Sequence, residues 1–66
     1  MFNQFDRVVV TTDDFEGLGV PRGAICFIVD LYTSDEFELD YYHEEETGAV
    51  GLTFGARSDQ IRRFDE

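Results

Sequence analysis

The stretch Glu36–Tyr42 alternates between apolar and outward-facing polar positions without a fault, and this pattern constrains the fold more than any other part of the chain. Successive side chains of a β-strand point to opposite sides, so a period of two is typical of a half-buried strand. The side chains that we expect on the inner face are Phe37, Leu39 and Tyr41. Those that we expect on the outer face are Glu36, Glu38, Asp40 and Tyr42.

Three other stretches also predict strands. Residues 5–12 contain three consecutive Val and two Thr, which suit the pleated surface of a sheet. Residues 24–32 are apolar but lack clean alternation, which indicates a strand that is either buried on both faces or bulged. Residues 49–54 alternate large apolar with small residues. The side chains expected to be mostly buried are Val8, Val10, Ile25, Phe37, Leu39, Tyr41, Val50, Leu52, Phe54 and Ile61.

The connecting segments carry turn residues. Residues 13–23 hold three Gly, the only Pro and two adjacent Asp, which predicts a long ordered loop. Its expected anchors on the core are Phe15, Leu18 and Val20. Residues 43–48 form a polar hairpin loop that ends in Gly. Residues 59–64 are a single helical turn, a last strand, or one followed by the other, with Ile61 and Phe64 as the buried candidates.

A chain of 66 residues allows one domain, which we expect to span residues 1–66. Five short strands with no helix long enough to cover a sheet favour a small closed barrel, because closure removes exposed edges. The predicted fold is therefore an all-β, five-stranded SH3-like barrel with a long first loop and a short 3-10 turn near the C-terminus. An OB-like barrel is the rival, although it usually needs longer strands and often a helix.

The charge is strongly acidic and unevenly distributed. Fifteen Asp and Glu stand against five Arg, for a net charge of −10, and residues 23–56 carry eight acids and no Lys or Arg. Such a field repels phosphate backbones and accelerates encounters with basic partners. We therefore expect no direct binding to DNA or RNA. An equally weighted interpretation is that the charge serves solubility.

The residues with reactive or metal-binding side chains do not form a recognisable catalytic or metal site in the sequence. Cys26 lies in the most apolar run, with no neighbour in sequence that would activate a thiol, so we interpret it as a buried structural residue. His43 lies beside Glu44–Glu46 in the sequence. We interpret this segment as a solvated loop rather than a metal site, since adjacent loop residues point to different sides. Phosphate-binding and nucleophile motifs are absent from the sequence. We expect a non-enzyme without cofactor or metal.

Four segments together resemble an uncharacterised bacterial family, the domain of unknown function 4926. They are Phe5–Val10, Gly19–Ile25, Glu36–Tyr41 and Asp59–Arg62. The resemblance covers about residues 5–63 and departs from the family pattern at residues 27–31, where the second strand looks extended. The family implies an SH3-like barrel and no catalytic residues.

Two classes of function fit these features, and both place the protein in the cytoplasm, away from membranes. The first is a non-catalytic acidic interaction protein that binds and blocks a basic protein, as an immunity protein or antitoxin blocks a nuclease-type toxin, or as a nucleic-acid mimic does. The second is an SH3-like adaptor that recognises a peptide through aromatic residues or docks on a larger assembly. The aromatic residues available for that role are Phe15, Tyr32, Tyr41 and Tyr42. The protein-binding residues predicted for the first class are Glu36, Glu38, Asp40, Tyr42, Glu44, Glu45 and Glu46.

Overall fold

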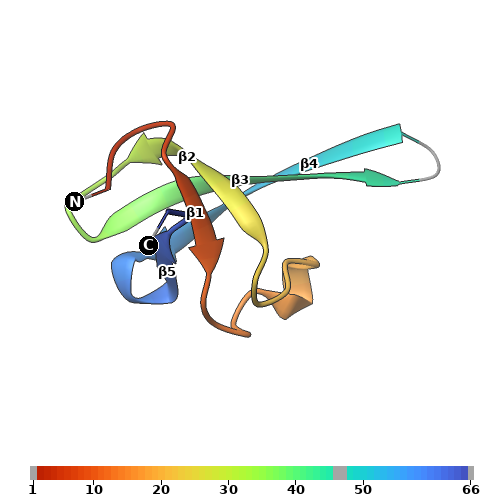
Figure 1. Cartoon of the computed structure of the whole chain (residues 1–66), viewed down its shortest axis with the longest axis horizontal. Coiled ribbons are helices and arrows are strands. Elements are labelled where there is room, and N and C mark those ends of the chain that lie inside the picture. Colours follow the sequence, from red (N-terminus) through yellow and green to blue (C-terminus); the bar gives the residue numbers. More distant parts are fainter. Residues whose placement is uncertain (1, 46–47, 66) are drawn as a thin grey trace.

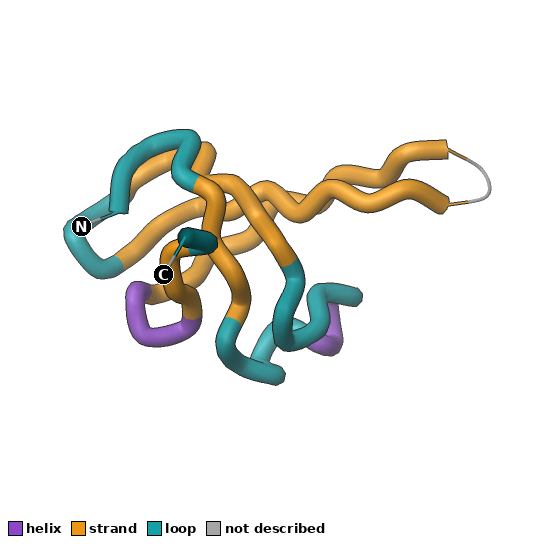
Figure 2. Tube along the Cα trace, in the orientation of Figure 1, coloured by secondary structure: helices purple, strands orange, loops and turns teal. Residues whose placement is uncertain are grey.

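Five β-strands and two 3-10 turns make up the structure, a computed structural model that describes residues 2–45 and 48–65 and, outside 43–50, their side chains. The strands are β1 (Arg7–Val10), β2 (Ile25–Leu31), β3 (Glu36–Glu45), β4 (Gly48–Arg57) and β5 (Ile61–Arg63). The 3-10 turns are η1 (Glu16–Leu18) in the first loop and η2 (Ser58–Gln60) before the last strand (Figures 1 and 2). The predicted all-β, five-stranded fold with a long first loop and a late 3-10 turn is confirmed.

All neighbouring strands pair antiparallel in one sheet of order β4-β3-β2-β1-β5. The last strand returns to the first, where Val8 lies opposite Arg63 and Val10 opposite Ile61. The strands therefore share one core. The two end strands, β4 and β5, are not neighbours in this order, so the described strands form an open sheet and the closed barrel that we expected is not formed by strand pairing.

Strand β2 is bulged, which was one of the two alternatives left open by its sequence. Its pairing with β3 shifts by one residue between Ile28 and Asp30. Before the shift it alternates, so Cys26 and Ile28 are fully buried whereas Ile25 and Phe27 are each 43% exposed. The predicted burial of Ile25 is thus wrong. A run of apolar residues does not show which face of a strand lacks a covering layer.

The core forms from the inner faces of all five strands together with the first loop. Its members are Val8, Val10, Phe15, Val20, Ala24, Cys26, Ile28, Phe37, Leu39, Phe54, Ala56 and Ile61. Tyr41 and Leu52 are only partly buried against this cluster, and the side chain of Val50 lies outside the described residues. Leu18 and Phe64 are exposed, contrary to expectation. Leu18 belongs to a single 3-10 turn, and Phe64 covers the guanidinium of Arg7 instead of the core.

The buried polar side chain of Gln60 ties the first loop to the C-terminal segment. Its Oε1 accepts a hydrogen bond from the backbone N–H of Arg57 at 2.8 Å, and its Nε2 donates to the carboxylate of Asp14 at 3.0 Å. Its backbone carbonyl accepts from the N–H of Thr11 at 2.9 Å. Local sequence patterns do not single out this residue, because its partner Asp14 lies 46 residues away in the chain.

We expect Gln60→Ala to lower the free energy of unfolding by about 1–3 kcal/mol, because it leaves the Arg57 N–H without its acceptor in a partly buried place. Urea denaturation monitored by tyrosine fluorescence measures this change. Ser58→Ala is the control, since its hydroxyl bonds the exposed Asp35 and its loss should cost at most about 0.5 kcal/mol. Equal losses in the two variants would contradict the role given to Gln60.

The β3–β4 hairpin gives the molecule its elongated shape. Each of its strands has ten residues, whereas β1 and β5 have four and three. In Figures 1 and 2 the two long strands run side by side well beyond the rest of the sheet. The principal extents of the molecule are 36 × 21 × 21 Å. The hairpin therefore projects beyond the rest of the sheet.

Candidate functional site

The predicted acidic row lies on the outer face of β3. Phe37 and Leu39 are buried on the inner side, so Glu36, Glu38 and Asp40 share the opposite face. Tyr42 continues this face and is 56% exposed. Glu36 is exposed as well, whereas Glu38 and Asp40 are half-buried. The alternation that we inferred for this strand is confirmed.

The acidic end of the hairpin is described only in part. Glu44 and Glu45 are the last residues of β3, but nothing is described of their side chains. Glu46 lies outside the described residues altogether. The structure thus brings Glu36, Glu38, Asp40 and Tyr42 together, and the place of the three glutamate side chains at the hairpin end stays a prediction.

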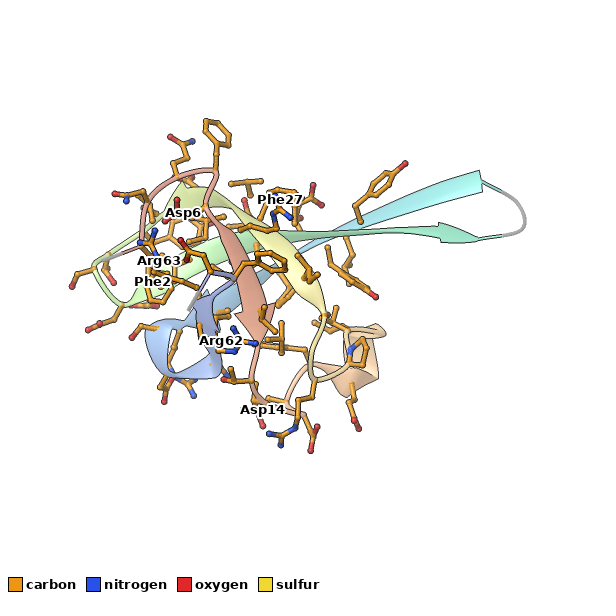
Figure 3. All side chains as sticks on the ribbon, in the orientation of Figure 1. Phe2, Asp6, Asp14, Phe27, Arg62 and Arg63 are labelled. Atoms are coloured by element: carbon orange, nitrogen blue, oxygen red, sulfur yellow. The ribbon has the colours of Figure 1, made fainter. Side chains whose placement is uncertain are left out.

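Two apolar side chains of β2 belong to the same face, and of these Ile25 was expected to be buried. Phe27 lies directly opposite Asp40 in the β2–β3 ladder, and Ile25 lies opposite Val9 in the β1–β2 ladder. Figure 3 shows Phe27 on β2, above the core. Because directly paired residues point to the same side of a sheet, Phe27 and Asp40 present an aromatic ring beside a carboxylate. This juxtaposition follows from the strand register, which local sequence patterns do not show.

The electrostatic surroundings of this face are negative over most of its length. Asp30 lies opposite Glu38 across the bulged ladder. The pKa of the nearby Tyr32 hydroxyl is raised, first by partial desolvation and then by the charges of Glu38 and Asp30. Strand pairing also brings Arg57 opposite Glu36, although the guanidinium of Arg57 forms its ion pair with Asp59 at 3.2 Å. One end of the acidic row therefore has a basic residue, Arg57, on the neighbouring strand. The order of residues along the chain does not show this.

A groove of about 360 Å³ lies beside this face. Its lining residues are Phe15, Tyr32, Glu36, Phe37, Gly55, Ala56, Arg57 and Gln60. Two of the four aromatic residues considered for a peptide groove, Phe15 and Tyr32, thus meet at one hollow. The other two do not join them, because Tyr41 packs against the core and Tyr42 stands on the projecting hairpin.

Cys26 is fully buried in the core, as we expected for a structural residue. Burial first, and the charge of Asp40 second, raise the pKa of its thiol to about 11. A thiol in this state is a poor nucleophile at neutral pH, since the thiolate is the reactive form.

We expect Cys26 to react with Ellman's reagent at pH 8 only after unfolding in urea. Its folded pKa lies above its unfolded value of about 8.5, so its contribution to stability is complete below that pH. This contribution is lost as the pH rises from there towards 11, because only the unfolded thiol ionises in that window. The difference in unfolding free energy between wild type and Cys26→Ala should shrink over the same window, and a constant difference would contradict the assignment.

Within the described residues, no group of three or more His, Cys, Asp or Glu side chains is arranged to hold a metal ion. Nor does any described helix have the length and apolar character needed to cross a membrane. The predicted hairpin loop of residues 43–48 is wrong in its bounds, because His43 lies in β3 and Gly48 begins β4; the side chain of His43 is not described.

Comparison of the chain with family models, with curated proteins and with solved structures gives no match. The resemblance to the domain of unknown function 4926 therefore stays a prediction.

Proposed function

We propose that the protein is a non-catalytic acidic domain that binds and blocks a basic protein through the outer face of β2 and β3. One observation carries this proposal. Phe27, an aromatic ring 43% exposed, lies directly opposite Asp40 on a face that also holds Glu38 and Tyr42. Phe27 thus lies between the carboxylate of Asp40 on β3 and Arg7 on β1, and its β3 side suits a partner that offers apolar contact beside Lys and Arg.

The composition of this face fits what is known of protein interfaces. Interface centres are depleted of Asp and Glu but enriched in aromatic residues, and a few aromatic or Arg side chains carry most of the binding energy. Phe27 and Tyr42 supply such anchors, which a row of acids alone lacks. The acids then guide a basic partner and set its orientation, because charge complementarity acts mainly on association rate and specificity.

The class of partner follows from the spacing of the acids. Alternate residues of a strand stand about 6.5–7 Å apart, which is close to the phosphate spacing along a nucleic-acid strand. A nuclease-type toxin with a basic substrate groove is therefore the kind of partner that we propose, with an immunity or antitoxin role for this chain. The negative charge of this face should also prevent the free protein from binding duplex DNA and RNA. We place the interaction in the cytoplasm.

Replacing Phe27 tests the proposal without changing charge. The partner is first captured from an extract of the native host and then titrated by calorimetry with wild type and with Phe27→Thr. We expect a loss of about 2 kcal/mol or more in binding free energy, as for an aromatic anchor at an interface. Leu18→Thr is the control, because Leu18 is similarly exposed but lies in η1 of the first loop. An acidic partner, or equal binding by both variants, would contradict the proposal.

A second function is favoured by the groove beside β3. Phe15 and Tyr32 line its 360 Å³ together with Arg57, which gives an aromatic hollow with one basic side chain at its rim. In SH3-type recognition such aromatic grooves accept proline-rich segments. An adaptor role predicts that a proline-rich peptide binds wild type and that Tyr32→Ala abolishes this binding while Phe27→Thr does not. The reverse result would favour the acidic-face proposal.

A further inference from the structure

β4 is the longer of the two end strands of the described sheet, with ten residues against three in β5. β4 ends the sheet, with β3 on one side and no described strand on the other. Backbone groups of successive residues in an antiparallel strand point alternately towards one neighbour and the other. It is therefore possible to work out which groups of β4 point away from β3.

The hydrogen bonds of Glu36 settle this direction. Its carbonyl accepts from the N–H groups of Tyr32 and Thr33 at 2.9 and 3.2 Å, so its backbone points away from β4. Arg57 lies opposite Glu36, and its N–H correspondingly points away from β3 and donates to the side chain of Gln60. By alternation, the backbone groups of Gly55, Thr53 and Gly51 also point to the open edge.

This edge lacks the protection that sheet edges usually have. Proteins protect an edge with Lys, Pro, a bulge or a covering segment. Residues 48–56 contain no charged residue and no Pro, and the β3–β4 ladder keeps one register along its whole length. Gly51, Thr53 and Gly55 are all exposed. A side-chain carbon added at Gly55 would meet no atom within 4 Å. An extended chain can therefore approach these N–H and C=O groups directly.

Charge complementarity identifies the occupant. On the outer face, Glu38 lies opposite Gly55, Asp40 opposite Thr53 and Tyr42 opposite Gly51. A strand added to β4 would lie about two strand spacings, or about 10 Å, from β3. A Lys or Arg opposite Gly55 can extend over the glycine to the carboxylate of Glu38, because no side chain stands between them.

We propose that β4 binds an extended basic segment of its partner as a sixth strand. The segment carries Lys or Arg opposite Gly55, a second basic residue opposite Thr53 and an aromatic or apolar residue opposite Gly51, beside Tyr42. Main-chain hydrogen bonds supply affinity and alternate side chains supply specificity, as in other cases of strand addition. This inference rests on the proposed function in one respect, namely that the partner is basic.

A synthetic peptide provides the probe. Fluorescein-labelled Thr-Lys-Val-Arg-Val-Tyr-Thr presents its Lys, Arg and Tyr on one face of a strand at the required spacing. A second peptide of the same sequence is N-methylated at these three residues, whose N–H groups would point to β4. Fluorescence anisotropy measures the binding of both peptides to the full chain. We expect the methylated peptide to bind at least about tenfold more weakly, although its charge is the same.

Variants of Thr53 test strand addition by changing the protein instead of the peptide. Thr53→Pro removes a donor that points away from β3, so the β3–β4 ladder stays intact and strand addition is blocked. Thr53→Val keeps the N–H and is the matched control. We expect Thr53→Pro to weaken peptide binding about tenfold or more and Thr53→Val to leave it nearly unchanged. Binding should also slow amide exchange at Gly51, Thr53 and Gly55.

The outcomes separate this inference from the proposed function. Equal binding of both peptides, or equal binding by the two Thr53 variants, would overturn strand addition at β4 while the acidic face remains a binding surface. A peptide that fails to bind at all, or a dimer that Thr53→Pro dissociates, would overturn it too. Insensitivity of peptide binding to salt and to Glu38→Gln would count against the acidic face itself. If Thr53→Pro does not fold, the comparison of the two peptides on wild-type protein still tests strand addition.

Discussion

Replacing Glu38 and Asp40 together by Lys should weaken binding to the basic partner by about 2–5 kcal/mol, provided that the two carboxylates face desolvated Lys or Arg. Both side chains lie on the outer face of β3 beside Phe27, so the change reverses the charge at the centre of the proposed contact. Association of the wild type should be fast and should slow steeply with added salt, because exposed charges steer the encounter. Titration of the captured partner at several salt concentrations measures both effects.

Glu16→Lys with Asp65→Lys is the control for this double variant. Both residues are exposed and lie outside the sheet, and the substitutions change the net charge by the same amount. A loss confined to the Glu38 and Asp40 variant therefore reports a local contact rather than a change in the overall field. If both double variants bind the partner as wild type does, the acidic face serves solubility and the groove beside Tyr32 becomes the better candidate.

Phe37→Ala should bring the protein close to unfolding at room temperature. Phe37 is 1% exposed and packs edge-on against Phe2, with ring centroids 5.3 Å apart. Truncating a buried Phe lowers the free energy of unfolding by about 3–5 kcal/mol, because apolar contacts are lost and a cavity is left behind. A domain of this size has a free energy of unfolding of roughly 3–10 kcal/mol, so a loss of this size removes a large part of its stability.

Phe27→Ala is the matched comparison, since it removes the same side chain from the outer face of the neighbouring strand. Phe27 is far more exposed, and we expect a loss of about 1 kcal/mol or less. Urea denaturation of the three proteins, followed by circular dichroism, gives the comparison. Similar losses for Phe27→Ala and Phe37→Ala would show that the assignment of inner and outer faces is wrong.

The strands with clear alternation could be predicted from sequence because their burial pattern is local. Phe37 and Leu39 are buried and Glu36 is exposed, as a period of two requires. The same reasoning located the first loop, whose Phe15 and Val20 anchor it to the core. Turn residues and β-branched runs carry this information within a few positions of the chain.

What could not be predicted depends on which segments meet. Ile25 and Phe27 are apolar, yet each is 43% exposed on the outer face of β2, and the sequence of β2 alone does not reveal this. The placement of Arg57 opposite Glu36 and the partners of Gln60 depend on the register between distant segments. The acidic row and Tyr42 of the candidate site were therefore predicted, whereas Phe27 was missed.

The pairing of β1 with β5 has a consequence for how the chain is made. Val8 meets Arg63, so the first strand finds its second neighbour only at residues 61–63. During synthesis the domain cannot complete its sheet until these residues have left the ribosome. Contacts between such distant residues are formed slowly, because a long loop must close before they yield any stabilisation. Until residues 61–63 emerge, one side of β1 stays open, and premature pairing with other chains is easiest.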